Sequence, residues 1–342
     1  MAMPAESSPH ERTLIAFPCR HELWRGRLYE GQLAWAHLAR TIADFEPVTM
    51  LANPADAASA SDLCAHPNID VVEIALDDSW LRDTAPIYVT GHAADGTPRR
   101  VGVDFSFNGW GGKYLPCDND DAIAQRWTEH AGHERVRAPM VLEGGAITVD
   151  GEGTLITTEQ CLLNSNRNPD LSRREIEETL GAALGIEKVI WIPYSIDDRD
   201  TDSHVDLVAM FIEGGRLLWQ GCSDRNDPEF DRLAISRRCL LGAQDARGRA
   251  LELVDLPVLP YCEIDGERLP VPYANLYLCN GGVIVPVCGH PADGDMLDII
   301  ASCFPDRRVV GVPGEIIAVG GGGPHCTTQQ VPALPVPVPL TH

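Results

Sequence analysis

Four polar segments hold the residue types that covalent attack on a cationic carbon requires. They are DDSWLRDTAP (77–86), LEGGAITVDGEG (142–153), DDRDTDSHVD (197–206) and GGGGPHCTTQQ (320–330), and each adjoins an apolar run. Together they offer a thiol, an imidazole and several carboxylates. A thiolate is a strong nucleophile, an imidazole moves protons near neutral pH, and carboxylates bind the N–H groups of a cation in pairs.

The thiol and the imidazole also have simpler structural explanations. Cys326 is one of 11 cysteines, most of which we expect to be buried as small hydrophobes. Its position behind four glycines and a proline favours a nucleophile. His204 and Asp206 project from one face if their segment is a strand. We expect His325 to be structural, because adjacent side chains of an extended segment point to opposite faces.

The remaining candidates are weaker when each is taken alone. Asp83 could pair with Arg82, and Glu143 could be a surface acid in front of two glycines. Trp80 and Trp110 are more often core residues than ligand contacts. Their value for function depends on whether the fold brings them together.

Composition excludes several classes of function. The chain has 27 Lys and Arg against 50 Asp and Glu, a formal net charge of −23. This charge repels nucleic acids and anionic membrane surfaces and attracts small cations. An odd number of cysteines without any C-x-x-C pair disfavours a disulfide framework and a zinc cage, so we expect reduced thiols in the cytoplasm. The sequence contains no run of 18 apolar residues, so no membrane-spanning helix is predicted.

Short Val- and Ile-rich runs alternate with amphipathic segments, which predicts an α/β fold. Strands are expected at 71–76, 154–158, 188–192, 207–212, 216–220, 283–287 and 308–312. Helices are expected at 31–45, 172–185 and 227–242. Ser172 and Glu175 form a capping-box pattern at the start of the second helix.

A weak internal repeat refines this prediction. Glu143-Gly144-Gly145, Glu213-Gly214-Gly215 and Asn280-Gly281-Gly282 each precede a strand-like run. Their near-constant spacing indicates modules of about 70 residues, five of which would account for the length. Two glycines before a strand are also common turn chemistry. The Pro-rich end of the chain, 331–342, is expected to form an extended surface tail.

The polar segments, taken in order, resemble the agmatine deiminase family of the guanidine-modifying (pentein) superfamily, which is related to bacterial peptidyl-arginine deiminases. The resemblance covers nearly the whole chain and is carried by WLRDTAP (80–86), FNGWGG (107–112), EGG (143–145), LLNSNRNP (162–169), DTDSHVD (200–206) and GGGPHCTTQQ (321–330). It implies one catalytic domain over 1–342. It also implies a five-bladed α/β propeller with pseudo-fivefold repeats around a polar channel, and neither a metal nor an organic cofactor.

The resemblance also implies a role for each site residue. Cys326 would attack the guanidinium carbon. His204 would protonate the departing ammonia and then activate water, held in place by Glu143. Asp83 and Asp206 would bind the guanidinium nitrogens. The expected ligand contacts are Trp80, Trp110 and Asp200.

The expected activity is hydrolysis of agmatine, a small cationic guanidino compound, to N-carbamoylputrescine and ammonia, within polyamine biosynthesis leading to putrescine. Other substrates stay open, among them free arginine, peptidyl arginine and a specialised metabolite. So do amidino transfer to an amine and a non-enzymatic role as a binding module. A homo-oligomer is compatible with the sequence.

Several residues depart from the family pattern. Ala85 and Ser203 replace glycines, Asp202 replaces an asparagine, Leu207 replaces a frequent asparagine, and Arg199 stands where the family often has an acid. None of these changes removes a catalytic group. Most lie near the far end of the substrate in family terms. They therefore put the identity of the substrate in question more than the guanidine chemistry.

Overall fold

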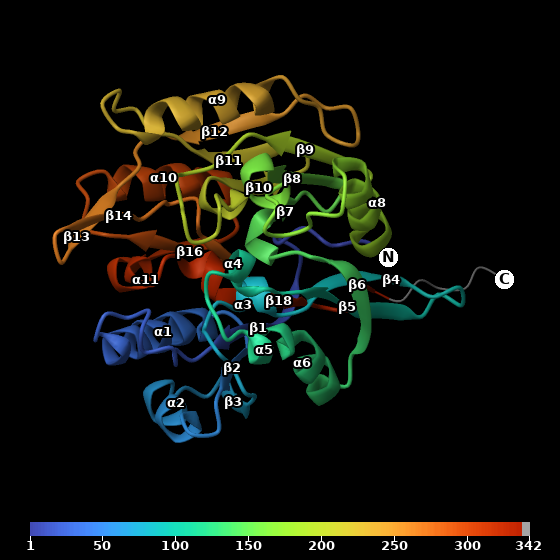
Figure 1. The fold of residues 1–342 in the computed structure, drawn as a ribbon, viewed down its shortest axis with the longest axis vertical. Helices are drawn as coiled ribbons and strands as arrows, with labels where there is room; N and C mark the ends of the chain where they lie inside the picture. The colour runs from blue at the N-terminus through green and yellow to red at the C-terminus, as the bar shows by residue number, and fades with distance from the viewer. Residues whose placement is uncertain (337–342) are drawn as a thin grey trace.

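Five β-sheets with one strand pattern make up most of the protein (Figure 1). The computed structural model describes residues 1–336. In each sheet an antiparallel pair is joined by a strand parallel to the second of the pair. Four of these triplets are consecutive: β4 (Ile87–His92), β5 (Pro98–Ser106) and β6 (Glu134–Val141); β7 (Ile147–Val149), β8 (Thr154–Thr158) and β9 (Lys188–Ile192); β10 (Ala209–Glu213), β11 (Arg216–Gln220) and β12 (Glu252–Leu256); β15 (Tyr277–Cys279), β16 (Gly282–Val287) and β17 (Arg308–Pro313).

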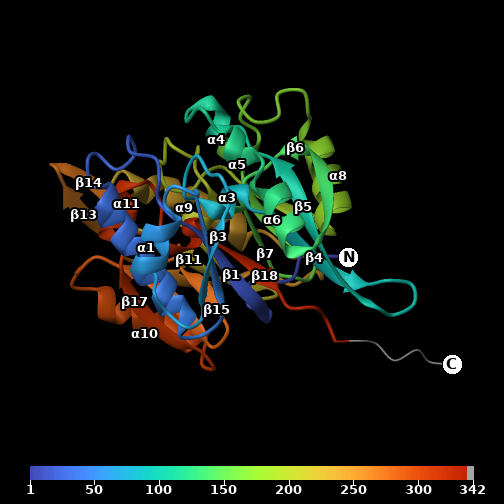
Figure 2. The same ribbon diagram turned by 90° about the horizontal axis from the view of Figure 1, so that it is seen from below.

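The fifth sheet joins the two ends of the chain. Strand β18 (Thr328–Pro332) pairs antiparallel with β1 (His10–Ala16), which is followed by the parallel strands β2 (Val48–Ala52) and β3 (Ile69–Glu73). Both views show β1 and β18 side by side (Figures 1 and 2). The predicted tail thus begins later than expected, because Val331 and Pro332 belong to β18 and Val331 is fully buried. Residues 337–342 of that tail lie outside the described residues.

Helices connect the second and third strand of each triplet, as parallel pairing requires. They are α1 (Leu28–Ala43), α5 (Asp118–Asp121), α6 (Ile123–Ala131), α7 (Glu159–Leu162), α8 (Arg173–Leu184), α9 (Glu229–Leu241) and α10 (Asp293–Cys303). Elements outside this pattern include α2 (Ala57–Leu63), α11 (Glu315–Val319) and the hairpin of β13 (Tyr261–Ile264) and β14 (Glu267–Pro270). No helix within the described residues is both long and apolar enough to cross a bilayer.

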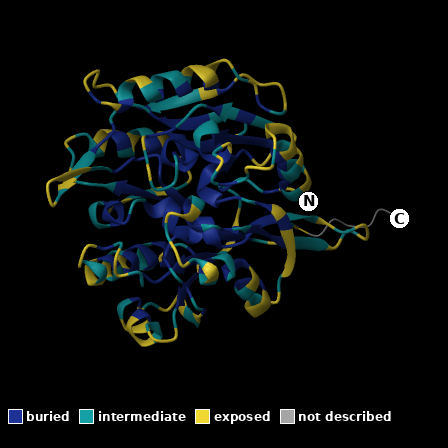
Figure 3. Ribbon diagram, viewed as in Figure 1, coloured by how far each residue is buried: buried dark blue, intermediate teal, exposed yellow. Residues whose placement is uncertain are grey.

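The predicted α/β class and the predicted elements are confirmed, with shifts of a few residues at their ends. The capping box of α8 is present: the Ser172 side chain accepts from the backbone N–H of Glu175, whose carboxylate accepts from the backbone N–H of Ser172. Apolar residues of α8 pack with β7 and β8 in one buried cluster. Buried residues gather in the middle of the molecule, and exposed ones lie on outer helices such as α9 and α2 (Figure 3).

The predicted repeat rests on three glycine pairs, and one of the three does not occupy the corresponding position. Gly215 and Gly281 are the second residues of the β10–β11 and β15–β16 hairpin turns and have positive φ, which glycine adopts without strain. The corresponding β7–β8 turn is at 150–153, whereas Gly144 and Gly145 lie before β7. These two glycines are needed for close packing, since a Cβ on Gly145 would stand 2.6 Å from Nδ1 of His204.

Candidate active site

A short segment precedes the first strand of each sheet, and these five segments meet. They are α3 (Leu81–Thr84), η1 (Gly144–Ala146), η2 (Val205–Leu207), residues 272–275 and α12 (Pro324–Thr327). α3 contacts both α12 and η1, and η1 contacts η2. Asn275 joins the set because its side chain donates to the backbone oxygen of Asp206 and its backbone oxygen accepts from the N–H of His325. The five sheets therefore position one shared cluster of polar side chains.

Cys326 lies in this cluster as a buried thiol. The side-chain amide of Asn275 donates to its sulfur at 3.2 Å, and Oδ2 of Asp206 is 3.4 Å from the sulfur. Burial, followed by the carboxylates of Asp206 and Asp83, raises the pKa of Cys326 well above its ordinary value. The free protein therefore holds a protonated thiol, which a bound cation would make more acidic.

Asp83 is held by two donors. Its Oδ2 accepts from the indole N–H of Trp110 at 2.9 Å, and its Oδ1 accepts from the backbone N–H of Gly145 at 2.9 Å. Burial raises the pKa of Asp83, assisted by the neighbouring carboxylates and opposed by His204. A cationic ligand would supply the positively charged partner that the Asp83 carboxylate lacks in the free protein.

His204 is buried, and neither ring nitrogen has a hydrogen-bond partner among the described residues. Its Nδ1 lies 3.9 Å from Oδ1 of Asp83. A carboxylate oxygen of Glu143 lies within 4.8 Å of a ring nitrogen, so the structure brings this predicted pair together without a direct bond. His204 precedes the turn η2 rather than lying on a strand, so the condition for His204 and Asp206 to share one strand face is not met.

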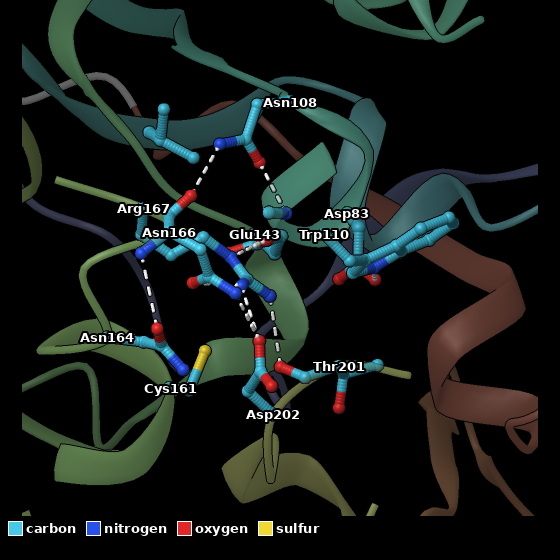
Figure 4. Close-up of polar contacts among 12 residues, drawn as sticks. Asp83, Asn108, Trp110, Glu143, Cys161, Asn164, Asn166, Arg167, Thr201 and Asp202 are labelled. Atoms are coloured by element: carbon cyan, nitrogen blue, oxygen red, sulfur yellow. Dashed lines mark hydrogen bonds and ion pairs between the residues drawn. The ribbon is translucent and has the colours of Figure 1, made fainter. Parts of the chain in front are cut away.

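Glu143 instead pairs with Arg167, which is buried at the centre of a network (Figure 4). Nε of Arg167 donates to Oε1 of Glu143 at 2.5 Å, and Nη1 donates to Asp202 at 2.7 Å. Lys113 also pairs with Asp202, at 2.7 Å. Burial opposes ionisation of Asp202, but Lys113, Asn166 and Arg167 outweigh it and lower its pKa. The departure from asparagine at 202 thus places an anion between two cations.

Asp206 is fixed by a buried imidazole. Nδ1 of His325 lies 2.8 Å from Oδ2 of Asp206, and Nε2 lies 2.9 Å from Glu6. Glu6 and Asp206 outweigh burial and Arg82 and raise the pKa of His325, while His325 and Arg82 overcome burial and lower that of Glu6 to about 2. The expected structural role of His325 fits these contacts. Its segment, however, is the helical turn α12 and not an extended strand.

The remaining predicted residues surround a narrow chamber. Trp80, Asp83, Trp110, Asp200 and Cys326 all line a space of about 20 Å³. A larger cavity of about 1070 Å³ adjoins it and shares Asp200 with the chamber. Tyr114, Gly320 and Gly321 also line both spaces, so the chamber opens toward the outer cavity along this side.

Asp200 stands where the chamber meets the outer cavity. Its Oδ1 accepts from the hydroxyl of Tyr114 at 2.6 Å. Lys113 donates to the backbone oxygens of Arg199 and Asp200, which ties this loop to the segment that carries Trp110. Arg199, one of the departures from the family pattern, is exposed and lines the outer cavity.

Three contacts within the cluster were not predicted from the sequence. Asn275 touches the thiol, Arg167 holds Glu143, and Glu6 holds His325. The repeat offered a signal for Asn275, because this residue precedes the strand pair around Asn280-Gly281-Gly282 just as the other site residues precede theirs. Arg167 lies in the quoted LLNSNRNP motif, but nothing in its local sequence indicates its partner.

A thiol, an imidazole and several carboxylates are thus enclosed together where five α/β sheets meet. The model of the Porphyromonas-type peptidyl-arginine deiminase family matches residues 2–332. The chain belongs to this family.

Named relatives agree with this assignment. The agmatine deiminase of Stutzerimonas stutzeri (strain A1501) is 41% identical, with 97% of this chain and 95% of that protein covered. The agmatine deiminase of Pseudomonas aeruginosa (strain LESB58) is also 41% identical, with the same coverage of 97% and 95%. The solved agmatine deiminase of Enterococcus faecalis has a TM-score of 0.92 at 34% identity, with 97% of this chain and 95% of that chain covered. The fold is therefore the mixed α/β fold of the solved agmatine deiminases.

Proposed function

We propose that this protein hydrolyses agmatine to N-carbamoylputrescine and ammonia through a covalent adduct on Cys326. One observation carries the proposal: the buried Cys326 thiol lies 3.4 Å from Asp206 and shares its chamber with Asp83, Trp80 and Trp110. The agmatine deiminases among the relatives are about 40% identical over nearly the whole chain. We also propose that Asp200, at the outer end of the chamber, binds the distal ammonium of agmatine.

The carboxylates account for recognition of the reacting group. A guanidinium keeps its charge at neutral pH and offers five N–H donors in a plane. Burying it without anions is prohibitive, so Asp83 and Asp206 would bind its nitrogens. At about 4 Å and an effective dielectric near 20, opposite charges attract by roughly 4 kcal/mol, which lowers a thiol pKa by about 3 units before desolvation is counted. The substrate thus favours the thiolate that attacks it.

The proposed reaction then proceeds in two steps. The sulfur of Cys326 bonds to the guanidinium carbon and its proton passes to His204, which delivers it to the nitrogen that leaves as ammonia. Water, deprotonated by His204, attacks the resulting amidino thioether, the C–S bond breaks, and the ureido product and the thiol are released. Glu143, fixed by Arg167, would stabilise the protonated His204 across the short gap between them.

The test is an assay with agmatine, arginine and other guanidines in which ammonia and ureido product are measured, with Cys326→Ala as the control. Turnover of agmatine that Cys326→Ala abolishes is the expected result. Unchanged turnover in Cys326→Ala would falsify the mechanism. If product forms only when an amine acceptor is added, the enzyme is an amidinotransferase.

A larger guanidino substrate is the second candidate. The cavity of about 1070 Å³ continues beyond Asp200 and is lined by Arg199, where the family often has an acid. Peptidyl arginine or a guanidine with an acidic distal group would use this space. A higher kcat/KM for such a compound than for agmatine would favour it.

We further propose that the five sheets are the blades of a propeller that forms one domain over 1–342. The repeated strand pattern and the pairing of β18 with β1 support this arrangement. We place the enzyme in the cytoplasm, a proposal supported by the 11 cysteines, all of which are free thiols.

A further inference from the structure

A second buried thiol, which the proposed reaction does not use, lies beside the catalytic imidazole. Cys161 is on α7 and fully buried. Its sulfur, a ring nitrogen of His204 and a carboxylate oxygen of Glu143 all lie within 4.8 Å of one another. Among the residues that the structure describes, this is the one group of three such side chains at that spacing.

The atoms of this cluster are available for a ligand. Both ring nitrogens of His204 and Oε2 of Glu143 are buried without any hydrogen-bond partner in the described structure. Buried polar atoms are nearly always paired, so unpaired atoms on two adjacent residues indicate a site for a further group. The exposed fraction of the residue is 1% for His204 and 0% for Glu143, which makes the set enclosed rather than a surface patch.

The backbone holds the cluster in place. The hydroxyl of Thr158 accepts from the N–H of Cys161 and donates at 2.8 Å to the backbone oxygen of Ser203, the residue before His204. Arg167 fixes the other carboxylate oxygen of Glu143. Thr158 therefore links the backbone segments that carry Cys161 and His204, and Arg167 orients Glu143.

The donor set selects the class of ion. Sulfur, imidazole nitrogen and carboxylate oxygen are ligands that suit zinc and its heavier congener cadmium. Three protein ligands around a four-coordinate ion leave one position for water. Magnesium and calcium prefer oxygen ligands only. The nearby carboxylates, among them Asp83 with its Oδ1 3.9 Å from Nδ1 of His204, favour a dication.

We propose that Glu143, Cys161 and His204 bind one Zn²⁺ and that the bound ion inhibits the enzyme. Cys161 binds as the thiolate and releases its proton to water; nothing is oxidised or reduced. A ring nitrogen of His204 then donates its lone pair to the metal, so this nitrogen can no longer carry a proton. The binding is independent of the proposed function, and the inhibition rests on it.

Cadmium titration tests the binding. The thiolate-to-cadmium absorption band is followed in the wild type, Cys161→Ala, Cys326→Ala and the matched control Cys64→Ala, which removes a buried thiol at the end of α2. Cys161→Ala is expected to lose one tight equivalent and the other two variants to keep it. Equal stoichiometry in Cys161→Ala overturns the proposal. Loss in Cys326→Ala also overturns it, because the ion would then sit on the nucleophile.

Inhibition is measured with agmatine at increasing Zn²⁺, with Mg²⁺ as a control that should not inhibit. The Zn²⁺ concentration for half-inhibition is expected to rise at least about tenfold in Cys161→Ala and to stay unchanged in Cys64→Ala. Tight cadmium binding without inhibition would refute the inhibitory role. A protein with no guanidine turnover would still report on the site through the absorption band, which separates failure of the site from failure of the proposed function.

A second variant covers the possibility that Cys161→Ala does not fold. His204→Asn keeps Cys161 and removes the nitrogen ligand, and it should likewise lose the tight equivalent of cadmium. Thermal unfolding followed by circular dichroism shows whether each variant is folded. A folded His204→Asn that binds cadmium as the wild type does contradicts the proposed ligand set.

Discussion

At the scale of single residues, the thiol of Cys326, which we propose as the nucleophile, is held protonated in the free protein. Cys326 is buried near the carboxylates of Asp206 and Asp83, and both raise its pKa. The carboxylate of Asp206 is itself held ionised by His325, which outweighs its burial and lowers its pKa. The same negative charge that suppresses the thiolate would attract the cationic substrate that we propose. In that proposal, selectivity for cations and protection of the thiol have one cause.

Asn275 supplies the side-chain amide N–H group that contacts the sulfur of Cys326. In Asn275→Ala a thiolate would lose this donor, and a hydrogen bond to a charged group contributes about 1.5–3 kcal/mol. We expect kcat/KM to fall by roughly 10- to 100-fold. The pH at which the rate of Cys326 alkylation by a haloacetamidine reaches half its maximum should also rise.

The conservative control for this prediction is Asn280→Ala, whose amide contacts the backbone of His10 and not the thiol. It should leave the alkylation profile unchanged. An unchanged profile in Asn275→Ala would show that the contact at 3.2 Å does not stabilise the thiolate.

At the scale of elements, one-turn segments carry the chemistry and the sheets carry the packing. The turn α4 (Gly109–Gly112) covers the chamber with Trp110, and all four of its residues have positive φ. Glycine adopts this conformation without strain, whereas an L-residue pays about 1–2 kcal/mol. The glycines therefore allow Trp110 to reach Asp83.

Two alanine substitutions in α4 separate strain from collision. Gly112→Ala adds only strain, because a Cβ there meets no atom within 4 Å. Gly109→Ala adds strain and a collision with the backbone oxygen of Tyr114. We expect Gly109→Ala to raise KM and lower kcat by at least about tenfold, and Gly112→Ala to change both by only a few-fold. Equal kinetics in the two variants would contradict a role for the turn in placing Trp110.

A pH-sensitive contact joins α5 to the segment before Trp80. Oδ1 of Asp120 accepts from the backbone N–H groups of Asp77 and Asp78. Burial raises the pKa of Asp120 to about 8 and that of Asp78 to about 7. Both carboxyls hold a proton in the folded protein at pH values where the unfolded chain has lost it.

The sign of the pH dependence follows from these values. Carboxyls of the unfolded chain titrate near pH 4, so between about pH 4 and 8 the folded state binds more protons and its stability falls as pH rises. Asp120→Asn removes one of the two groups. As the pH rises from 5 to 9, the free energy of unfolding measured in urea should decrease in both proteins. We expect the decrease in Asp120→Asn to be smaller than that in the wild type by up to a few kcal/mol. Parallel curves would contradict the raised pKa.

At the scale of the whole molecule, the last strand completes the first sheet. Val331 is fully buried in β18, and Arg82 beside the site donates to Gln330 of the same strand. Stability of the N-terminal sheet and placement of α12 with Cys326 are therefore coupled. Of the residues after Pro332, those that the structure describes, 333–336, are half-buried or exposed.

Two truncations test the closing strand. Removal of residues 333–342 should leave the cooperative thermal transition and the activity close to those of the full chain. Removal of 328–342 deletes β18 and should abolish the cooperative transition, because β1 loses its antiparallel partner and Val331 leaves the core. A truncation at 328 that melts like the full chain would show that the closure is dispensable.

Features that are encoded locally could be predicted from the amino-acid sequence. Strand and helix positions follow from apolar periodicity, and the capping box of α8 lies within four residues of chain. Cys326, His204, Asp83 and Asp206 were predicted because each stands in a short motif whose residue types suit guanidine chemistry.

The side chains that hold these residues come from segments far apart in the chain and could not be predicted from local sequence. Glu6 meets His325 across 319 positions, and Asn275 meets Cys326 across 51. Glu143 pairs with Arg167 and not directly with His204. Such contacts depend on how the five sheets bring the turns before their first strands together. A pairing between turns leaves no periodicity in either segment, because local sequence sets the conformation of each turn and the packing of the sheets sets the distance between them.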